Sequence, residues 1–325
     1  MNRYFGSLLL MGAILSFAPR TALAVTIETV IVGNPGNTPD FLYAYGPFGA
    51  VGYSYRIGKY EVTNAQYTEF LNAKATSDPL GLYSVEMGMF ATGRGGIARS
   101  GSDGNYSYAT IANRAELPVN NVNWYQSIRF INWLNNGQGD GDTETGSYTL
   151  LGGTPEPSNG LTITRNVGAK VVLPSEDEWY KAAYYDPATN TYFQYPTSSD
   201  VVPAAEAPPG GDNSANFQSV ANADLTNVGA YVASDSPYGA FDMGGNVYEW
   251  NESVYPGGIP GGPDRGLRGG WYGGFEVDMR ASTVTMQVPV VAQFNNGFRI
   301  AMIPEPASWL LVIAVASAAV FVRCR

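Results

Sequence analysis

The fold is decided by residues 238–250, which read YGAFDMGGNVYEW. Asn246 lies between a glycine pair and Trp250, an arrangement typical of a tight turn that leads into a strand. The Asn246 side chain can satisfy backbone groups in such a turn without any ligand. Trp250 offers a large apolar face and one N–H group, so we expect it in the core. The same expectation holds for the other tryptophans of similar setting, namely Trp124, Trp179 and Trp271.

The composition around this stretch favours an irregular, loop-rich fold. The 325 residues are enough for one large domain, and 45% of them are apolar. Only 14% are charged, while Gly (39), Tyr (22) and Pro (21) are plentiful. The formal net charge of −10 excludes a basic nucleic-acid-binding surface, which needs concentrated Lys and Arg. An acidic chain is compatible with divalent cations or simply with a solvated surface.

Two absences restrict the chemistry. The chain contains no histidine, which removes the usual general base and the imidazole ligands of zinc and non-haem iron. Its one cysteine is Cys324, next to the last residue, so an internal disulfide or a two-thiolate site is excluded. Any metal should therefore be a hard cation with oxygen ligands.

The first residues predict export. A basic start at Arg3 is followed by an apolar stretch over 8–18 and by Ala22-Leu23-Ala24, which together describe a secretory signal peptide over residues 1–24. Val25 is then the expected first residue of the mature chain. The alternative is a buried N-terminal helix.

The last residues predict sorting or anchoring. Pro304-Glu305-Pro306 precedes an apolar run over 307–322, and Arg323 and Arg325 close the chain. Residues 304–325 resemble the PEP-CTERM sorting signal, which in its family is recognised and cut by an exosortase in bacteria that make exopolysaccharide. The alternative is a single membrane span whose arginines stay on the cytoplasmic side. Either way, we expect the body in the cell envelope or outside the cell, held by the inner membrane transiently or permanently.

Between these ends, three segments have helical periodicity, namely 63–75, 123–135 and 175–185; Thr63 can cap the first, and Ser175 and Glu178 form a capping box at the third. Short β-prone runs lie at 26–32, 171–173 and 298–302. Long loops are expected at 81–115, 137–168 and 197–215. The acidic stretch at 140–144 lacks the spacing of an EF-hand and should be an exposed loop. The pattern indicates one α+β domain over residues 25–303.

The order of the motifs resembles the formylglycine-generating (sulfatase-modifying factor) family. The matching blocks are 55–64 (YRIGKYEVTN), 118–124 (PVNNVNW), 173–179 (LPSEDEW), 238–250, 268–271 (RGGW) and 296–299 (NGFR). The resemblance implies an irregular α+β domain that is related to C-type lectins. From the residues themselves, Glu61 and Glu178 are interpreted as carboxylates beside helix starts, where the positive end of the dipole favours them.

The resemblance also implies where chemistry should occur. Oxidase members of the family bind copper through two cysteines that follow the Arg-Gly-Gly block, because soft thiolates hold Cu(I). Those positions are Gly274 and Met279 here. Relatives that use iron hold it with histidines, which this chain lacks. We therefore expect no catalytic residue and no copper.

Calcium is the cofactor that the resemblance still implies, because its ligands are oxygens. One structural site would use Asp242 and Glu249 with the carbonyl groups of Gly245 and Val247. The other would use Asn216 and Asp224 with the carbonyl groups of Phe217 and Thr226. Ordinary turns remain the alternative for both sets.

The leading hypothesis is an exported, non-catalytic protein that binds a glycan or peptide of the envelope. Tyrosines in the long loops could contact such a ligand or pack the loops internally; they are Tyr83, Tyr106, Tyr108, Tyr192 and Tyr195. A formylglycine-generating oxidase acting on a sulfatase cysteine is the alternative. A hydrolase with a carboxylate pair is a third hypothesis, although no spacing singles out such a pair. Display of variable loops for target recognition also stays open.

Overall fold

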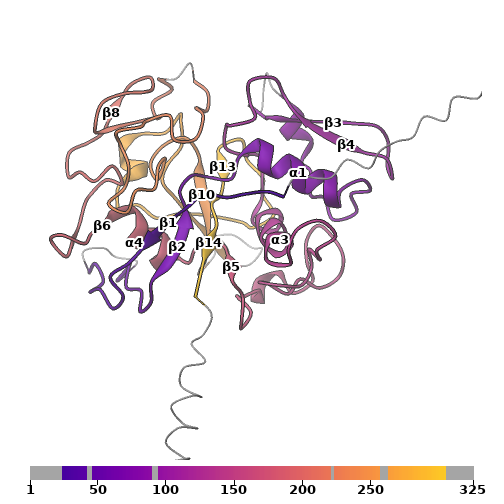
Figure 1. Ribbon diagram of the computed structural model, residues 1–325, viewed down its shortest axis with the longest axis horizontal. Helices are drawn as coiled ribbons and strands as arrows, with labels where there is room; N and C mark the ends of the chain where they lie inside the picture. The colour runs from indigo at the N-terminus through magenta and orange to yellow at the C-terminus, as the bar shows by residue number, and fades with distance from the viewer. Residues whose placement is uncertain (1–23, 42–45, 90–93, 221–222, 257–262, 305–325) are drawn as a thin grey trace, which may run out of the picture.

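The computed structural model describes residues 24–41, 46–89, 94–220, 223–256 and 263–304 (Figure 1). The predicted signal peptide and sorting signal lie almost entirely outside these ranges, as does Cys324. The helices are α1 (Asn64–Lys74), α3 (Trp124–Asn135) and α4 (Glu176–Tyr184), with short 3-10 turns η1 (Val85–Gly88), η2 (Gly160–Thr162) and η3 (Glu276–Met279). The strands are β1 (Thr29–Val32), β2 (Tyr55–Gly58), β3 (Ile97–Ser100), β4 (Ser107–Thr110), β5 (Val171–Val172), β6 (Tyr185–Asp186), β7 (Thr191–Tyr192), β8 (Ala204–Ala205), β9 (Ser214–Ala215), β10 (Tyr248–Tyr255), β11 (Asp264–Arg268), β12 (Thr285–Gln287), β13 (Asn296–Gly297) and β14 (Ala301–Met302).

The three predicted helices are confirmed, and each begins with a capping box. At α4 the Ser175 hydroxyl accepts from the Glu178 amide at 3.2 Å, and the Glu178 carboxylate accepts from the Ser175 amide at 2.7 Å. Thr63 and Asn123 make the same reciprocal pair with the glutamine three residues later at α1 and α3. Each box satisfies N–H groups that the first helical turn leaves unpaired, so the sequence defines where these helices start.

The strands of the described residues form two four-stranded sheets and three two-stranded ones. The first has the order β1-β2-β14-β5 with antiparallel neighbours, and the second has the order β12-β11-β10-β13. In the second sheet β10 pairs antiparallel with β11 and parallel with β13. In Figure 1, α1 and α3 lie side by side to the right of β10, and α4 lies to its left. The predicted α+β fold in a single domain is therefore confirmed.

The turn at residues 238–250 has the predicted form. Gly245 and Asn246 both adopt positive φ, at 80° and 59°, and β10 begins two residues later. Alanine at Gly245 would place its Cβ 2.3 Å from the carbonyl oxygen of Asn216. The close approach of two backbones therefore requires glycine at this point.

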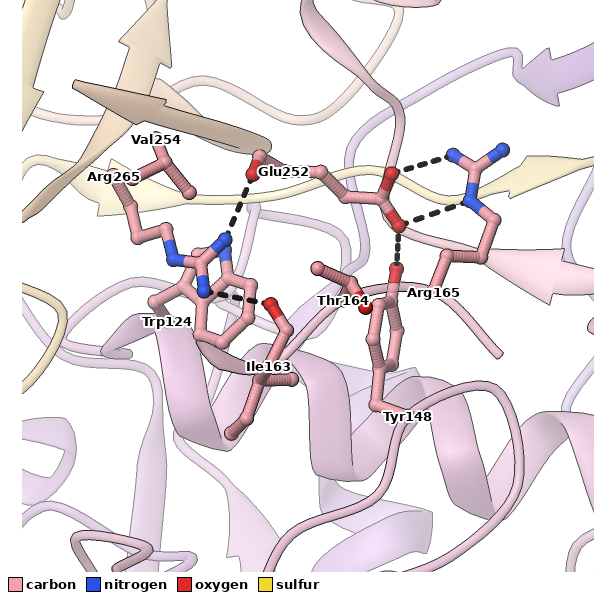
Figure 2. A pocket seen from close by; sticks show the side chains of 8 residues that line it. All are labelled: Trp124, Tyr148, Ile163, Thr164, Arg165, Glu252, Val254 and Arg265. Atoms are coloured by element: carbon pink, nitrogen blue, oxygen red, sulfur yellow. Dashed lines mark hydrogen bonds and ion pairs between the residues drawn. The ribbon is translucent and has the colours of Figure 1, made fainter. Parts of the chain in front are cut away.

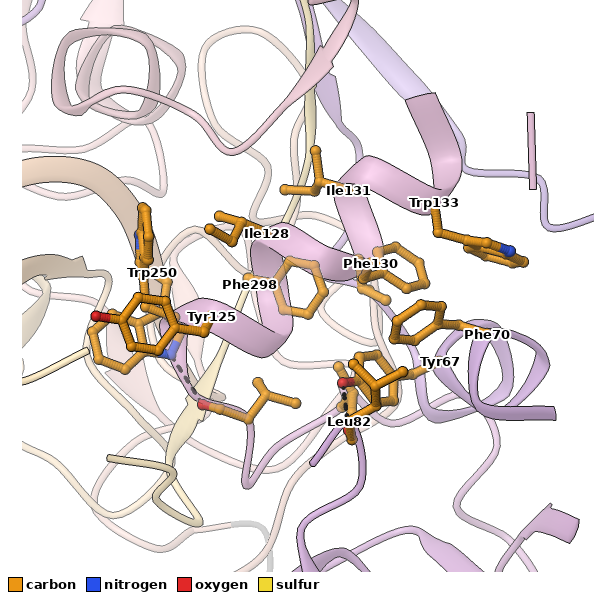
Figure 3. Close-up of a cluster of buried hydrophobic side chains, with 14 of the residues drawn as sticks. Tyr67, Phe70, Leu82, Tyr125, Ile128, Phe130, Ile131, Trp133, Trp250 and Phe298 are labelled. Atoms are coloured by element: carbon orange, nitrogen blue, oxygen red, sulfur yellow. Dashed lines mark hydrogen bonds between the residues drawn. The ribbon is translucent and has the colours of Figure 1, made fainter. Parts of the chain in front are cut away.

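The main core lies around α1 and α3. Tyr67 and Phe70 of α1 pack against Phe130 and Trp133 of α3, and Phe298 closes the cluster (Figure 3). These rings are fully buried or nearly so and meet at 5.3–5.7 Å, mostly in tilted and edge-to-face contacts. The core predictions for Trp124, Trp179 and Trp250 are also confirmed, since none of the three is exposed.

Two loop predictions need correction. Residues 81–115 contain the β3–β4 hairpin, in which Ile97 pairs with Thr110. The acidic stretch at 140–144 is not wholly exposed, because Glu144 forms an ion pair with the buried Arg129 at 2.6 Å. Arg129 also donates to the carbonyl groups of Thr154 and Pro155, so one helical side chain holds the long connection in place. The sequence alone does not show that Glu144 pairs with Arg129, so it predicts a solvated loop there.

Candidate functional site

The two positions that would carry cysteines lie just after strand β11. Gly269 and Gly270 turn the chain with φ of 94° and 78°, and η3 ends at Met279. Residue 274 therefore lies in the loop between these glycines and η3. The geometry there shows what each position can hold.

A side chain at Gly274 would require Asp278 or Trp271 to move. A Cβ at this position would lie 2.6 Å from Oδ2 of Asp278 and 2.9 Å from Cδ1 of Trp271, closer than real Cβ contacts. Trp271 is half-buried, and its ring meets Tyr272 and Phe294 edge-on at 5.1 and 5.5 Å. The expectation that Trp271 belongs to the core is thus only partly met. Its indole instead covers the place where a side chain at position 274 would start.

We expect Gly274→Ala to lower the free energy of unfolding by about 1–3 kcal/mol, because Trp271 or Asp278 must move to admit the methyl group. Denaturant unfolding measures this change. The matched control is Gly52→Ala, since no atom lies within 4 Å of a Cβ at Gly52. In a Trp271→Ala background the cost should shrink, because one of the two close contacts is gone. An equal cost in both backgrounds would contradict the packing of Trp271 on Gly274.

Met279 is not available as a ligand either. It is fully buried in a small apolar cluster with Tyr195, Ala215 and Phe217. Its carbonyl oxygen accepts a hydrogen bond from the Tyr184 hydroxyl at 2.9 Å, which fixes the backbone of η3. A thioether enclosed by side chains cannot coordinate a metal from solvent without unpacking this cluster. Across the described ranges, no group of three or more Cys, Asp or Glu side chains is placed to hold a metal ion.

Beside these positions lies an aromatic surface, which we define as the contacting rings of Trp271, Tyr272 and Phe294 together with Phe275 of the same loop. Phe294 is 39% exposed and packs on the buried Tyr272 at 6.4 Å, and Phe275 is 63% exposed. Exposed aromatic side chains that lie close together are typical of binding surfaces.

The first predicted calcium set is brought together by β10 and the turn before it. Asp242 is buried with φ of 55°, and its Oδ2 accepts from the Gly229 amide at 2.5 Å. Glu249 is also buried, but Arg299 donates to both of its oxygens at 2.5 and 2.6 Å. Trp179 donates to the same carboxylate at 2.8 Å. A calcium ion at this set would therefore share Glu249 with Arg299.

Glu61 joins this cluster, which the sequence interpretation did not anticipate. It is buried, and its Oε1 accepts from the side-chain amide (Nδ2) of Asn246 at 3.2 Å, while its Oε2 has no hydrogen-bond partner. Burial and the nearby Asp242 charge raise the pKa of Glu61 well above its ordinary range. Burial likewise raises the pKa of Asp242 to about 6. Arg299 donates to Glu249, and its buried positive charge also acts on the nearby Glu61 and Asp242.

In the sequence, the one sign that Glu61 is buried is its position between two apolar residues, Tyr60 and Val62. The interpretation of Glu61 as a helix-start carboxylate missed its contacts with Asn246 and its proximity to Asp242.

The second predicted calcium set is linked to the first through Asn246. The Asn246 side chain accepts from the Thr226 amide at 3.0 Å and donates to the Thr226 carbonyl group at 3.3 Å. Asn216 is buried, donates to the Asp224 carbonyl group at 3.0 Å, and leaves its own Oδ1 without a partner.

The remaining members of this set are engaged elsewhere. The Asp224 carboxylate pairs with Arg114 at 2.8 and 3.1 Å, and the Phe217 carbonyl group accepts from Val220 at 3.3 Å. In this set, Oδ1 of Asn216 is therefore the oxygen without a hydrogen-bond partner that a cation would use as a ligand.

Comparison with known proteins identifies the fold family. Residues 50–303 match the Sulfatase-modifying factor enzyme 1-like domain. This chain belongs to that family. The family resemblance of the sequence blocks is thereby confirmed, and the matched region covers the whole aromatic surface and all eight predicted calcium ligands.

Individual relatives of this sulfatase-modifying factor domain are distant. Hercynine oxygenase of Mycobacterium tuberculosis is 26% identical over 268 residues, which are 76% of this chain and 52% of that protein. Serine/threonine-protein kinase pkn1 of Chlamydia caviae is 32% identical over 143 residues, 40% of this chain and 20% of that protein. The chain thus spans about half the length, or less, of these relatives.

Two solved structures share the fold. CarF has a TM-score of 0.56 and 20% identity, and the alignment covers 87% of this chain and all of CarF. Treponema denticola variable protein 1 has a TM-score of 0.53 and 20% identity, with 87% of this chain and 98% of that one covered. At this identity the likeness concerns the fold.

A second carboxylate group of the domain surrounds Arg165. This arginine pairs with Glu252 (Figure 2) and with Glu178, each at 2.8 Å. The Tyr148 hydroxyl donates to Glu252, and the Tyr53 hydroxyl donates to Glu178 at 2.6 Å. Burial would raise the pKa of Glu178, but the bonds from Arg165 hold it below its ordinary value; burial raises the pKa of Glu252.

This arrangement does not favour the hydrolase hypothesis. The guanidinium of Arg165 lies between the two carboxylates, where the scissile bond of a sugar would have to lie. The cavity beside this cluster has a volume of about 100 Å³ and is lined by Trp124. The guanidinium carbon of Arg265 lies 3.7 Å from the ring centroid of Trp124 and covers that ring (Figure 2). The cluster is best understood as a buried ion network that joins β10 to α4.

Proposed function

We propose that this protein is a non-catalytic member of the sulfatase-modifying factor family that binds a glycan or peptide of the cell envelope. The observation that carries the proposal is the closure of both catalytic positions. Gly274 offers no side chain and is covered by Trp271 and Asp278, and the Met279 thioether is fully buried. A copper-dependent oxidation needs two accessible soft ligands, and neither position offers one.

The aromatic surface is where we expect the ligand to bind. Trp271 and Phe294 stand edge to face at 5.5 Å, and Phe275 extends the exposed apolar area. Sugar rings and peptide side chains both pack on such faces, while polar groups at the border supply hydrogen bonds. Arg94 lies 3.7 Å from Asp224 and provides such a polar border. The tyrosines proposed as ligand contacts contribute less, because Tyr83, Tyr108 and Tyr195 are buried.

A glycan and peptide array probed with the full chain, with and without Ca²⁺, tests this proposal. We expect a restricted set of ligands, at least tenfold weaker binding for Trp271→Ala, and unchanged binding for Phe41→Ala, whose ring is 68% exposed on another segment. Silence on every spot, or equal binding by both variants, would contradict the proposal and favour a purely structural role in the envelope.

We also propose structural Ca²⁺ at the two predicted sets. The carboxyl groups of Glu61, Asp242 and Glu249 lie near the one guanidinium of Arg299, and Asn216 has a buried oxygen without a hydrogen-bond partner; oxygen groups of this kind are the ligands that a hard cation takes. At a Ca²⁺ concentration 100 times Kd, binding at one site raises the free energy of unfolding by about 2.7 kcal/mol, so removing Ca²⁺ with EGTA should lower the melting temperature by roughly 5–10 °C. The shift should shrink in Asp242→Asn but not in Asp212→Asn, an exposed control. An unchanged melting temperature on chelation would remove the calcium proposal.

Export through the N-terminal signal and sorting by exosortase-type machinery remain part of the proposal. Val25, the expected mature N-terminus, donates its amide to Gln138 at 2.6 Å and accepts from the same side chain at 2.8 Å. The domain thus engages the chain from Val25 onward. Within the described ranges, no helix has both the length and the apolar character that a membrane crossing needs. The mass of the protein recovered from cells would reveal cleavage at either end.

A further inference from the structure

The sheet β1-β2-β14-β5 has one end at which the chain leaves the domain. Neighbouring strands are antiparallel, so β1 and β14 run toward this end and β2 and β5 run away from it. Strand β14 ends at Met302 and the described residues stop at Pro304, on the lower side of the domain in Figure 1. We define the exit end by the segments that the four strands place there, namely residues 31–35, 53–56, 166–171 and 302–304.

The exit end exposes apolar side chains. One row of residues crosses all four strands in register, namely Ile31, Arg56, Met302 and Val171. In this row Ile31 is 62% exposed and Met302 is 38% exposed. Val167, in the turn before β5, is fully exposed. Apolar groups that gather at one end of a domain are typical of an interaction surface.

The exit end also differs from the rest of the chain in charge. Its four segments contain Arg56 and Lys170 and no Asp or Glu, although the whole chain has 28 acidic and 18 basic residues. The next acid along the chain is Glu305, outside the described residues. Glu178, which accepts from a tyrosine of this end, is buried and paired with an arginine. Basic groups beside exposed apolar groups suit a lipid surface with anionic headgroups.

The sequence beyond the exit end places it close to a membrane. Only Glu305 and Pro306 separate Pro304 from the apolar run over 307–322. The three chain steps from residue 304 to residue 307 span at most about 11 Å. When the apolar run lies in a bilayer, the exit end is therefore held against its surface. Four strands about 4.8 Å apart form an end only about 15 Å wide, so all of it can rest on the headgroups.

We propose that the exit end is the membrane-facing surface of the domain and rests on anionic lipid headgroups. Ile31 and Val167 contact the lipid on either side of Met302, and Arg56 attracts the lipid phosphates. The proposal rests on the membrane anchoring proposed above for residues 304–325. It adds the orientation in which the anchored domain lies on the membrane.

Fluorescence quenching by lipids with a nitroxide headgroup tests this contact. The full chain is reconstituted, without exosortase, into vesicles of phosphatidylcholine and phosphatidylglycerol. Ile31→Cys and Val167→Cys, each in a Cys324→Ser background, carry a bimane label. We expect both labels to lose at least half of their fluorescence when the nitroxide lipid is present. Melting temperatures equal to that of Cys324→Ser alone show that the labelled variants are folded.

Two further labels serve as controls. Val232→Cys should keep its fluorescence, because Val232 is 68% exposed and follows Tyr231, which donates to Glu206 beside β8, at the upper left in Figure 1. Ser308→Cys reports whether the apolar run is in the bilayer and should be quenched. An unquenched label at residue 308 would overturn both the anchoring and this proposal. A quenched label at residue 308 with labels at 31 and 167 as bright as that at 232 would overturn this proposal alone.

A charge change tests the lipid headgroups as the partner. Arg56→Glu should at least halve the quenching of the label at Ile31, because it repels the phosphatidylglycerol headgroup. Lys74→Glu makes the same charge change on α1 and should leave that quenching unchanged. Equal quenching in the two variants would overturn the proposal. Ligand binding at Trp271 is measured without vesicles, so its outcome is independent of these results.

Discussion

Replacing Arg299 with leucine is expected to lower the free energy of unfolding by about 3–5 kcal/mol. The Arg299 guanidinium is fully buried and donates to both oxygens of Glu249 at 2.5 and 2.6 Å. It also donates to the carbonyl groups of Gly58 and Phe241, each at 2.9 Å, and so ties β2 and the turn before β10 to the strand itself. Without this cation, the Glu249 carboxylate stays buried beside other acidic groups. A buried charge that loses its partner is among the largest single-residue penalties.

Urea unfolding of the full chain measures this loss, with Arg56→Leu as the matched control. Arg56 is exposed and its guanidinium donates to Thr29, so its replacement should cost less than about 1 kcal/mol. The double variant Glu249→Leu/Arg299→Leu should be less destabilised than the sum of the two single variants, because the pair is removed together. Equal losses for Arg299→Leu and Arg56→Leu would show that the buried pair does not hold these elements together.

The helices were predictable because their signals are local. Thr63, Asn123 and Ser175 each stand one residue before a helix, and a capping partner follows three residues later. The turn at Asn246 was predictable for the same reason, since glycine and asparagine tolerate the positive φ that it needs.

The sheets were much less predictable. Strands such as β5, β13 and β14 have only two residues each, too few for an alternating pattern to stand out. Strand β14 pairs with β2 through Ala301 and Ile57, which come from opposite ends of the domain's sequence. Strand pairing over long sequence separations leaves no local trace, so the sequence indicated the class of the fold and not its sheet order.

In the candidate site, sequence comparison located Gly274 and Met279 but not what fills the space between them. Trp271 was assigned to the core because tryptophan usually packs there, yet it covers Gly274 and borders an exposed surface. Glu61 was missed because its relation to Asn246 spans 185 residues of sequence. The arginines that neutralise the buried carboxylates were missed for the same reason.

The second large effect that we expect is a complete lack of formylglycine-generating activity. Copper oxidation requires a pair of soft ligands that solvent and substrate can reach. The Met279 sulfur is buried with Phe217 and Tyr195, and position 274 has no side chain. Restoring both thiols in Gly274→Cys/Met279→Cys should also be insufficient, because the indole of Trp271 lies 2.9 Å from the Cβ position of residue 274.

The most direct measurement incubates the full chain with Cu(I), oxygen and a cysteine-containing sulfatase peptide, and follows aldehyde formation by mass spectrometry. A cysteine-containing family member that converts the peptide under the same conditions serves as the positive control. We predict that this chain yields no more aldehyde than a reaction without protein. Copper-dependent formylglycine from the unaltered chain would contradict the account.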